Sequence, residues 1–216
     1  YFELKKKYQD MLLFFRLGDF YEMFDEDAKE GARILGLTLT ARYRGTVQET
    51  AMCGVPYHSA ENYIAKLTKM GRRVAICEQL SDPNLPGIVK RDVVKIVTPG
   101  TTLNETILEA KKNHYCAALV TVHDSFGLSF IDLATGEFRL IELSNHDALE
   151  DTLRKLSPAE IIVERKDEVA GFLAKFPEFL VHEYQLPFHE DEEGILKKHF
   201  PVGCGYLPVY FRWRNP

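Results

Sequence analysis

The sequence predicts a mixed α/β protein of two units, an N-terminal mixed sheet with flanking helices in residues 1–100 and a second α/β unit from residue 113. Short apolar runs alternate with amphipathic segments, as expected for strands and helices. Of the 216 residues, 45% are hydrophobic, which is enough to bury a core. Residues 1–100 carry a net charge of +2 and the remainder carries −7. This asymmetry supports two units with different partners.

The first unit opens with a short helix at residues 2–10 and a buried strand at 11–17 that ends in a Gly-Asp turn. A second helix starts with acidic residues at Asp25, which suits the positive end of a helix, and stops at Gly36. The further expected elements are a strand at 37–41, a polar surface loop at 42–50, a turn at 54–58, a helix at 60–70 capped by Ser59, a strand at 74–77, a loop at 81–87 and a strand at 93–97.

The second unit follows a linker at residues 101–112, in which 103–112 is expected to be a connecting helix. A meander comes first, with turns short enough for hairpins, and strands and helices then alternate. The expected elements are strands at 117–123, 126–133 and 137–143, a helix at 147–156, a strand at 160–164, a helix at 169–176, a strand at 179–184 and a helical patch at 195–199. This is the order of a ribonuclease-H-like fold.

Several classes of site are disfavoured by the composition. The four cysteines, Cys53, Cys77, Cys116 and Cys204, form no Cys-x-x-Cys pair, so we expect buried reduced thiols rather than a zinc site or disulfides. No apolar run is long enough to span a bilayer, and no phosphate-binding loop of the Gly-x-x-x-x-Gly-Lys type is present. We therefore predict no catalytic residue, resident metal or cofactor in this chain, and no membrane partner.

The strongest functional signal lies at residues 14–24, which read FFRLGDFYEMF. Aromatic residues are usually buried, so the residues alone favour an ordinary core. The alternative is that the turn leaves Phe20 projecting from a rigid strand end, with Glu22 beside it. The stretch resembles the signature of the MutS family of DNA mismatch-repair proteins. The resemblance continues in residues 51–58 (AMCGVPYH), 74–79 (VAICEQ) and 94–101 (VKIVTPGT).

The resemblance implies a function and a domain plan. Residues 1–100 would be the mismatch-recognition domain, and 113–200 an incomplete ribonuclease-H-like connector domain. In that family the Phe-x-Glu pair contacts the mispaired base, so Phe20 would wedge at the base from the minor groove, Glu22 would hydrogen-bond it, and the duplex would kink. The ATPase, with its ATP and magnesium, would belong to the full-length protein only. The tail at 201–216 does not resemble the family.

The same resemblance implies partners. These are double-stranded DNA with mismatches or small insertion/deletion loops, a MutL-type repair protein at the connector, and self-association of the full-length protein. The expected location is the bacterial cytoplasm, on the nucleoid when DNA is bound. Phosphate contacts need basic side chains. The candidates are Arg42, Arg44, Lys66, Lys69, Arg72 and Arg73, although the loop around Arg42 is equally typical of a plain solvent-exposed segment.

Two rival functions come from other classes. A ribonuclease-H-like order suggests a metal-dependent nuclease, with Asp124 and Asp132 as the available carboxylates, but such chemistry needs several carboxylates converging on two ions. Magnesium-dependent cutting of DNA would identify it. The acidic second half also suits a module that only binds proteins, and this role is compatible with DNA recognition by the first half.

Overall fold

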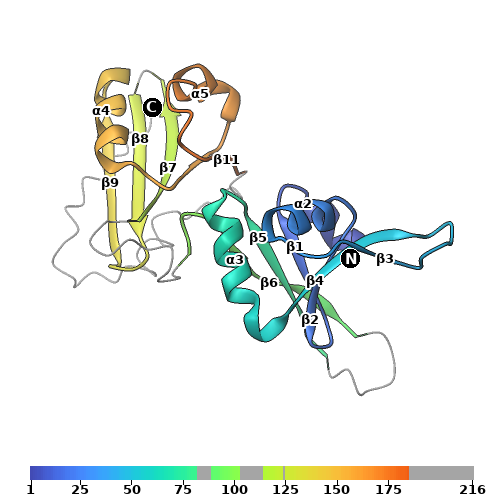
Figure 1. Cartoon of the computed structure of the whole chain (residues 1–216). Coiled ribbons are helices and arrows are strands. Elements are labelled where there is room, and N and C mark those ends of the chain that lie inside the picture. The colour runs from blue at the N-terminus through green and yellow to red at the C-terminus, as the bar shows by residue number, and fades with distance from the viewer. Residues whose placement is uncertain (82–88, 103–113, 124, 185–216) are drawn as a thin grey trace.

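The computed structural model describes residues 1–81, 89–102, 114–123 and 125–184, which form two sheets with their own helices (Figure 1). The first sheet has the order β3-β4-β2-β1-β5-β6, in which only the β1–β5 pair is parallel. The expected mixed sheet is therefore confirmed. Its elements are α1 (Phe2–Lys7), β1 (Leu12–Leu17), β2 (Phe20–Phe24), α2 (Asp25–Leu35), β3 (Thr40–Arg42), β4 (Thr50–Pro56), the 3-10 turn η1 (Tyr57–Ser59), α3 (Ala60–Lys69), β5 (Val74–Gln79) and β6 (Arg91–Val97).

The two faces of this sheet are covered differently. Side chains of a strand alternate between faces, so Phe14 and Tyr21 pack with α2 and α3 on one face. Leu13 and Phe15 belong to a smaller cluster on the opposite face, where Leu4 of α1 packs against them. We call that second face the α1 face, because α1 is the one helix that covers it among the described residues. Part of it is therefore left open to solvent.

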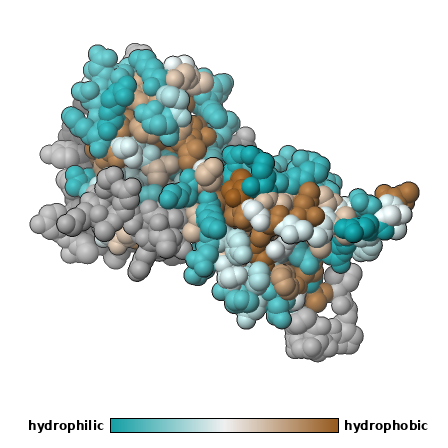
Figure 2. Space-filling model, in the orientation of Figure 1, coloured by the Kyte–Doolittle hydropathy of each residue, from teal (hydrophilic) through white to brown (hydrophobic). Residues whose placement is uncertain are grey.

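One hairpin projects from the sheet. In Figure 1, β3 and β4 extend away from the rest of the domain, and Figure 2 shows hydrophobic surface at their far end. Tyr43 is more than half exposed there, and Val47 is fully exposed. The expected surface loop at 42–50 is confirmed. A protruding hairpin with exposed apolar side chains is suited to contact another molecule.

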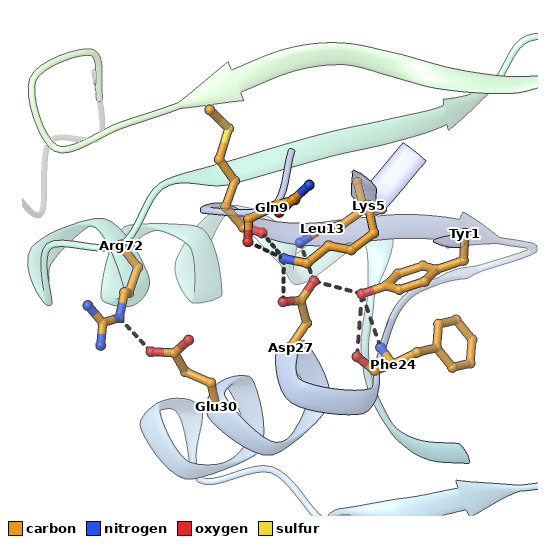
Figure 3. A network of polar contacts seen from close by, with 9 residues as sticks. Tyr1, Lys5, Gln9, Leu13, Phe24, Asp27, Glu30 and Arg72 are labelled. Atoms are coloured by element: carbon orange, nitrogen blue, oxygen red, sulfur yellow. Dashed lines mark hydrogen bonds and ion pairs between the residues drawn. The ribbon is translucent and has the colours of Figure 1, made fainter. Parts of the chain in front are cut away.

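A buried carboxylate fastens the N-terminal helix to the sheet (Figure 3). Asp27, at the start of α2, accepts hydrogen bonds from the Tyr1 hydroxyl at 2.7 Å and the Leu13 amide at 3.0 Å. Its second oxygen lies 2.7 Å from Lys5 Nζ. Because Asp27 is only 5% exposed, its charge needs these partners. The network therefore determines where α1 covers the sheet.

The second sheet has the order β11-β10-β7-β8-β9. Strands β7, β8 and β9 form the antiparallel meander, and β10 and β11 add parallel strands beside β7. Helices α4 and α5 contribute Leu149, Leu153 and Phe172 to the core on one face. The expected α/β order is confirmed. The elements are β7 (Tyr115–Val122), β8 (Ser125–Asp132), β9 (Glu137–Leu143), α4 (His146–Leu156), β10 (Glu160–Val163), α5 (Lys166–Leu173) and β11 (Val181–Glu183).

The two units meet through a buried polar cluster. Glu160 is 1% exposed and accepts a hydrogen bond from the Gly100 amide at 3.0 Å. A side chain at Gly100 would come within 2.8 Å of Cys116, so the backbone approaches the second sheet closely. His182 Nε2 lies 3.7 Å from Glu160, and burial and the nearby Arg73 lower the pKa of His182. The last turn of the first unit is thus packed into the second.

One expectation for the first unit is wrong. The expected turn at 54–58 begins only at Tyr57, because β4 continues through Pro56. Glycine fits inside this strand because a Cβ at Gly54 would lie 3.2 Å from the Tyr21 carbonyl oxygen. Ser59 holds the N-cap position of α3, as expected, although its hydroxyl donates to the Pro56 carbonyl at 3.1 Å and not to the first turn of the helix.

Other differences concern the ends of elements. The strand expected at 37–41 is limited to β3, and β2 was not predicted as a strand.

Cys53, Cys77 and Cys116 are buried free thiols, as expected, and burial raises their pKa values to about 11, 11 and 12. No helix among the described residues is long and apolar enough to cross a membrane. The helices expected at 103–112 and 195–199, most of the loop at 81–87, the tail at 201–216, Asp124 and Cys204 lie outside the described residues.

Candidate nucleic-acid interface

The candidate site is built on the β1–β2 hairpin. Leu17 pairs with Phe20 across a two-residue loop, Gly18-Asp19. Gly18 has φ +58°, which the first position of a type II′ hairpin turn requires and which glycine adopts without strain. Strand β2 leaves this turn directly, so Phe20 is its first residue. The local sequence therefore places an aromatic side chain at the very end of a strand pair.

Hydrogen bonds from two neighbouring elements brace this turn. The Gly18 amide donates to Gln79 Oε1 at 3.2 Å, and the Tyr57 amide donates to the Asp19 carbonyl at 2.9 Å. The Arg16 guanidinium stacks 3.8 Å from the centre of the Tyr57 ring. These contacts tie the loop to β5 on one side and to η1 on the other. Phe20 is therefore presented by a rigid support, which reduces the ordering cost of any contact it makes.

Phe20 and Glu22 lie on the open part of the α1 face. They alternate along β2 with Tyr21 and Met23, which pack under α2 and α3. Phe20 is 47% exposed, which is unusual for a phenylalanine next to a fully formed core. The geometry thus supports a projecting ring more than a core residue.

The Glu22 carboxylate is partly buried in this surface. Its neighbours across the strands are Phe15 and Gly54, and a Cβ on Gly54 would lie 3.5 Å from Glu22 Cγ. Oε2 has no hydrogen-bond partner among the described residues and lies 3.6 Å from Arg42 Nη1. Burial raises the pKa of Glu22, and the charge of Arg42 partly offsets this rise. The carboxylate is thus held close to a cation without a direct bond to it.

The predicted basic residues fall into two groups. Arg42 and Arg44 lie on the projecting hairpin, and Arg42 lies next to the Phe20–Glu22 surface through its ion pair. Lys66 and Lys69 are exposed on α3, on the opposite face of the sheet. Of the six predicted basic residues, only Arg42 forms an ion pair with Glu22.

The two remaining arginines are engaged in ion pairs. Arg72 Nε lies 2.6 Å from Glu30, on the neighbouring helix α2. Arg73 is 8% exposed and pairs with Asp10. Their guanidinium groups therefore support the packing of the first unit, and neither lies beside Phe20. Arg73 also faces the junction between the units, since its charge acts on His182.

The carboxylate considered for a nuclease has a structural role. Asp132 Oδ1 accepts hydrogen bonds from the Ala134 and Thr135 amides, at 2.9 and 3.3 Å. Oδ2 accepts one from the His114 amide at 3.2 Å. These bonds shape the turn after β8. In the described part of the chain, no three His, Cys, Asp or Glu residues are grouped to hold a metal ion.

The residues that support the turn were not predicted from the sequence. Gln79, Tyr57 and Arg91 all contact the Arg16–Asp19 segment, and Arg91 Nε donates to the Arg16 carbonyl at 2.9 Å. Neighbouring residues in the sequence do not reveal this role, because strand pairing brings distant positions together. The parallel pairing of β1 and β5, for example, places Gln79 beside Gly18, 61 residues away. The available signal was that Tyr57 and Gln79 lie within two of the four blocks of resemblance, 51–58 and 74–79.

Comparisons with known proteins agree on one family. The model of MutS domain I matches residues 1–106, and the model of MutS domain II matches residues 114–185. Curated relatives carry the name DNA mismatch repair protein MutS. That of Lachnoclostridium phytofermentans is 41% identical over 213 residues, 94% of this chain and 22% of the relative. Those of Halothermothrix orenii and Acetivibrio thermocellus are 47% and 48% identical, over 81% and 76% of this chain and 20% and 19% of theirs. The chain spans about a fifth of the length of these relatives.

Proposed function

Because this chain belongs to the MutS family and matches its domains I and II, we propose that the first unit recognises mispaired bases in double-stranded DNA. Phe20 is the wedge, and Glu22 is the residue that bonds the displaced base. The observation that carries the proposal is the half-exposed Phe20 ring on a braced turn, on a sheet face left open by α1.

A wedge reads deformability instead of base edges. A mispair stacks poorly, so opening the step costs less there than at a matched pair. Apolar side chains that enter from the minor groove unstack a step and kink the duplex. Phenylalanine suits this role because its ring stacks on any base and carries no donor or acceptor that would need a partner. The proposed readout therefore tolerates many mismatches and small insertion or deletion loops.

Glu22 adds a polar contact beside the wedge. Its Oε2 atom has no hydrogen-bond partner among the described residues, so a base N–H group would satisfy a buried acceptor. A carboxylate near phosphates is otherwise repelled, which penalises matched DNA that offers no such contact. Phe20 thus stacks on a base, and Glu22 accepts a hydrogen bond from one.

Phosphate contacts and the second unit complete the proposal. Arg42 and Arg44 are the proposed backbone contacts, since they lie on the projecting β3–β4 hairpin and Arg42 forms an ion pair with Glu22. The second unit would relay binding to an ATPase outside this chain and to a MutL-type partner, and the full-length protein would self-associate and collect on the nucleoid. ATP and magnesium would serve that ATPase, not the residues described above.

The proposal is tested with a chimera in which this chain replaces domains I and II of a full-length relative. Phe20→Ala is compared with Phe2→Ala, because Phe2 is also about half exposed but lies on α1, away from the turn. We expect Phe20→Ala to lose roughly 1–3 kcal/mol of binding to a mismatched duplex and little to the matched one. Fluorescence anisotropy on both duplexes gives these values.

Equal losses for the two variants would refute the wedge. A magnesium-dependent nicking activity of the chain would instead favour the nuclease alternative.

A further inference from the structure

The ion pair between Glu22 and Arg42 joins two residues with opposite relations to DNA. A carboxylate is repelled by phosphates, and a guanidinium binds them. The two groups lie 3.6 Å apart, with the Arg42 side chain 43% exposed and the Glu22 side chain 22% exposed. The arginine is therefore held by a partner while much of its surface is still accessible. The edge of the guanidinium that faces Glu22 is not free to form a bidentate contact with a phosphate, so binding to one group weakens binding to the other.

In the part of the chain that the structure describes, no charged side chain other than Arg42 acts on Glu22. Glu22 has Phe15 and Gly54 as its strand neighbours, which carry no charge. Among the described residues, Arg42 is the one charge that acts on the pKa of Glu22. Around Arg42 itself, the neighbours are the rings of Phe24 and Tyr43, at 5.8 and 5.4 Å from the guanidinium carbon. These rings position the guanidinium without competing for its charge.

We propose that Arg42 is a specificity-determining residue whose contact with the DNA backbone depends on Glu22. On matched DNA, Glu22 finds no base partner and keeps Arg42 beside it. At a mispair, the displaced base engages Glu22, and the released guanidinium binds a phosphate. This inference rests on the proposed function, because it requires Glu22 to contact the base. Arg42 therefore increases the affinity for mismatched DNA and leaves the affinity for matched DNA unchanged.

Arg44 provides the matched control. It lies two residues further along the same hairpin and is exposed, and no ion pair with Glu22 is observed for it. A phosphate contact by Arg44 should therefore strengthen matched and mismatched complexes alike. The proposal predicts that the two arginines differ in discrimination although they are equal in charge and close in position.

The first experiment needs no DNA. The Glu22 carboxyl carbon is followed by NMR through a pH titration of the 216-residue chain, with Arg42→Gln and Arg44→Gln as variants. We expect Arg42→Gln to raise the pKa of Glu22, because its counter-ion is gone, and Arg44→Gln to leave it unchanged. An identical Glu22 titration in all three proteins would overturn the ion pair and with it the proposal, whereas DNA recognition by Phe20 would be unaffected.

The second experiment measures the ratio of matched to mismatched dissociation constants in the chimera. Arg42→Gln should lower this ratio by on the order of tenfold, the usual worth of a charge-assisted hydrogen bond, and Arg44→Gln should leave it unchanged. In the Glu22→Gln background Arg42 is no longer restrained, so Arg42→Gln should weaken both complexes equally. Equal effects of the two arginine variants on the ratio would refute the proposal. Loss of discrimination by Phe20→Ala in the same assay verifies the underlying function separately.

Discussion

Truncation of two phenylalanines separates a core role from a wedge role. Phe14 is 0% exposed on β1, whereas Phe20 is 47% exposed three residues after that strand ends. Phe14→Ala should cost about 3–5 kcal/mol, since it removes a buried ring and leaves a cavity. Full burial of a phenylalanine contributes about 1.5–3 kcal/mol, so half burial with no cavity predicts about 1 kcal/mol for Phe20→Ala.

The assay is urea unfolding followed by NMR peak intensities of the first unit, because a two-domain chain need not unfold in one step. With a urea slope of about 2 kcal/mol per M, the midpoints should fall by about 2 M for Phe14→Ala and about 0.5 M for Phe20→Ala. A loss for Phe20→Ala as large as that for Phe14→Ala would show that Phe20 supports the core. Phe20 would then be a core residue and not an exposed wedge.

Three further predictions address the framework. Asp27→Ala should cost about 3 kcal/mol, as expected for breaking a buried ion pair, whereas Glu26→Ala, which removes an exposed pair, should cost under about 1 kcal/mol in the same urea assay. Burial and its bond to a carboxylate raise the pKa of Tyr21 to about 12, so the stability it contributes is complete below pH 10 and is lost as pH rises to 12. Tyr21→Phe should flatten that decline, and an unchanged slope would contradict it. Gly100→Ala should destabilise the chain by about 1–3 kcal/mol through overpacking at the junction, whereas Gly171→Ala, in open space on a helix, should stabilise it in thermal unfolding.

Much of the first unit was predictable because its signals are local. The αL glycine at the end of α2, Gly36, and the continuous apolar run that forms the buried strand β1 are set by neighbouring residues in the chain. The turn at 54–58 failed for the opposite reason. Gly54 and Pro56 are typical turn residues, but pairing with β2 holds them in a strand. Long-range pairing overrides local preference wherever a backbone finds its hydrogen bonds in a neighbouring strand.

For the candidate site, the sequence by itself singled out Phe20 and Glu22 through the turn, their spacing of two residues and the four blocks of resemblance. Only the tertiary structure decided what surrounds them. The parallel β1–β5 pairing brings Gln79 to the turn, and the β3–β4 hairpin brings Arg42 to within 3.6 Å of Glu22. A spacing of two along a strand is fixed by covalent geometry, so it can be read from the chain. Contacts between distant segments depend on how the strands pair and which face each helix covers, which only the folded sheet determines.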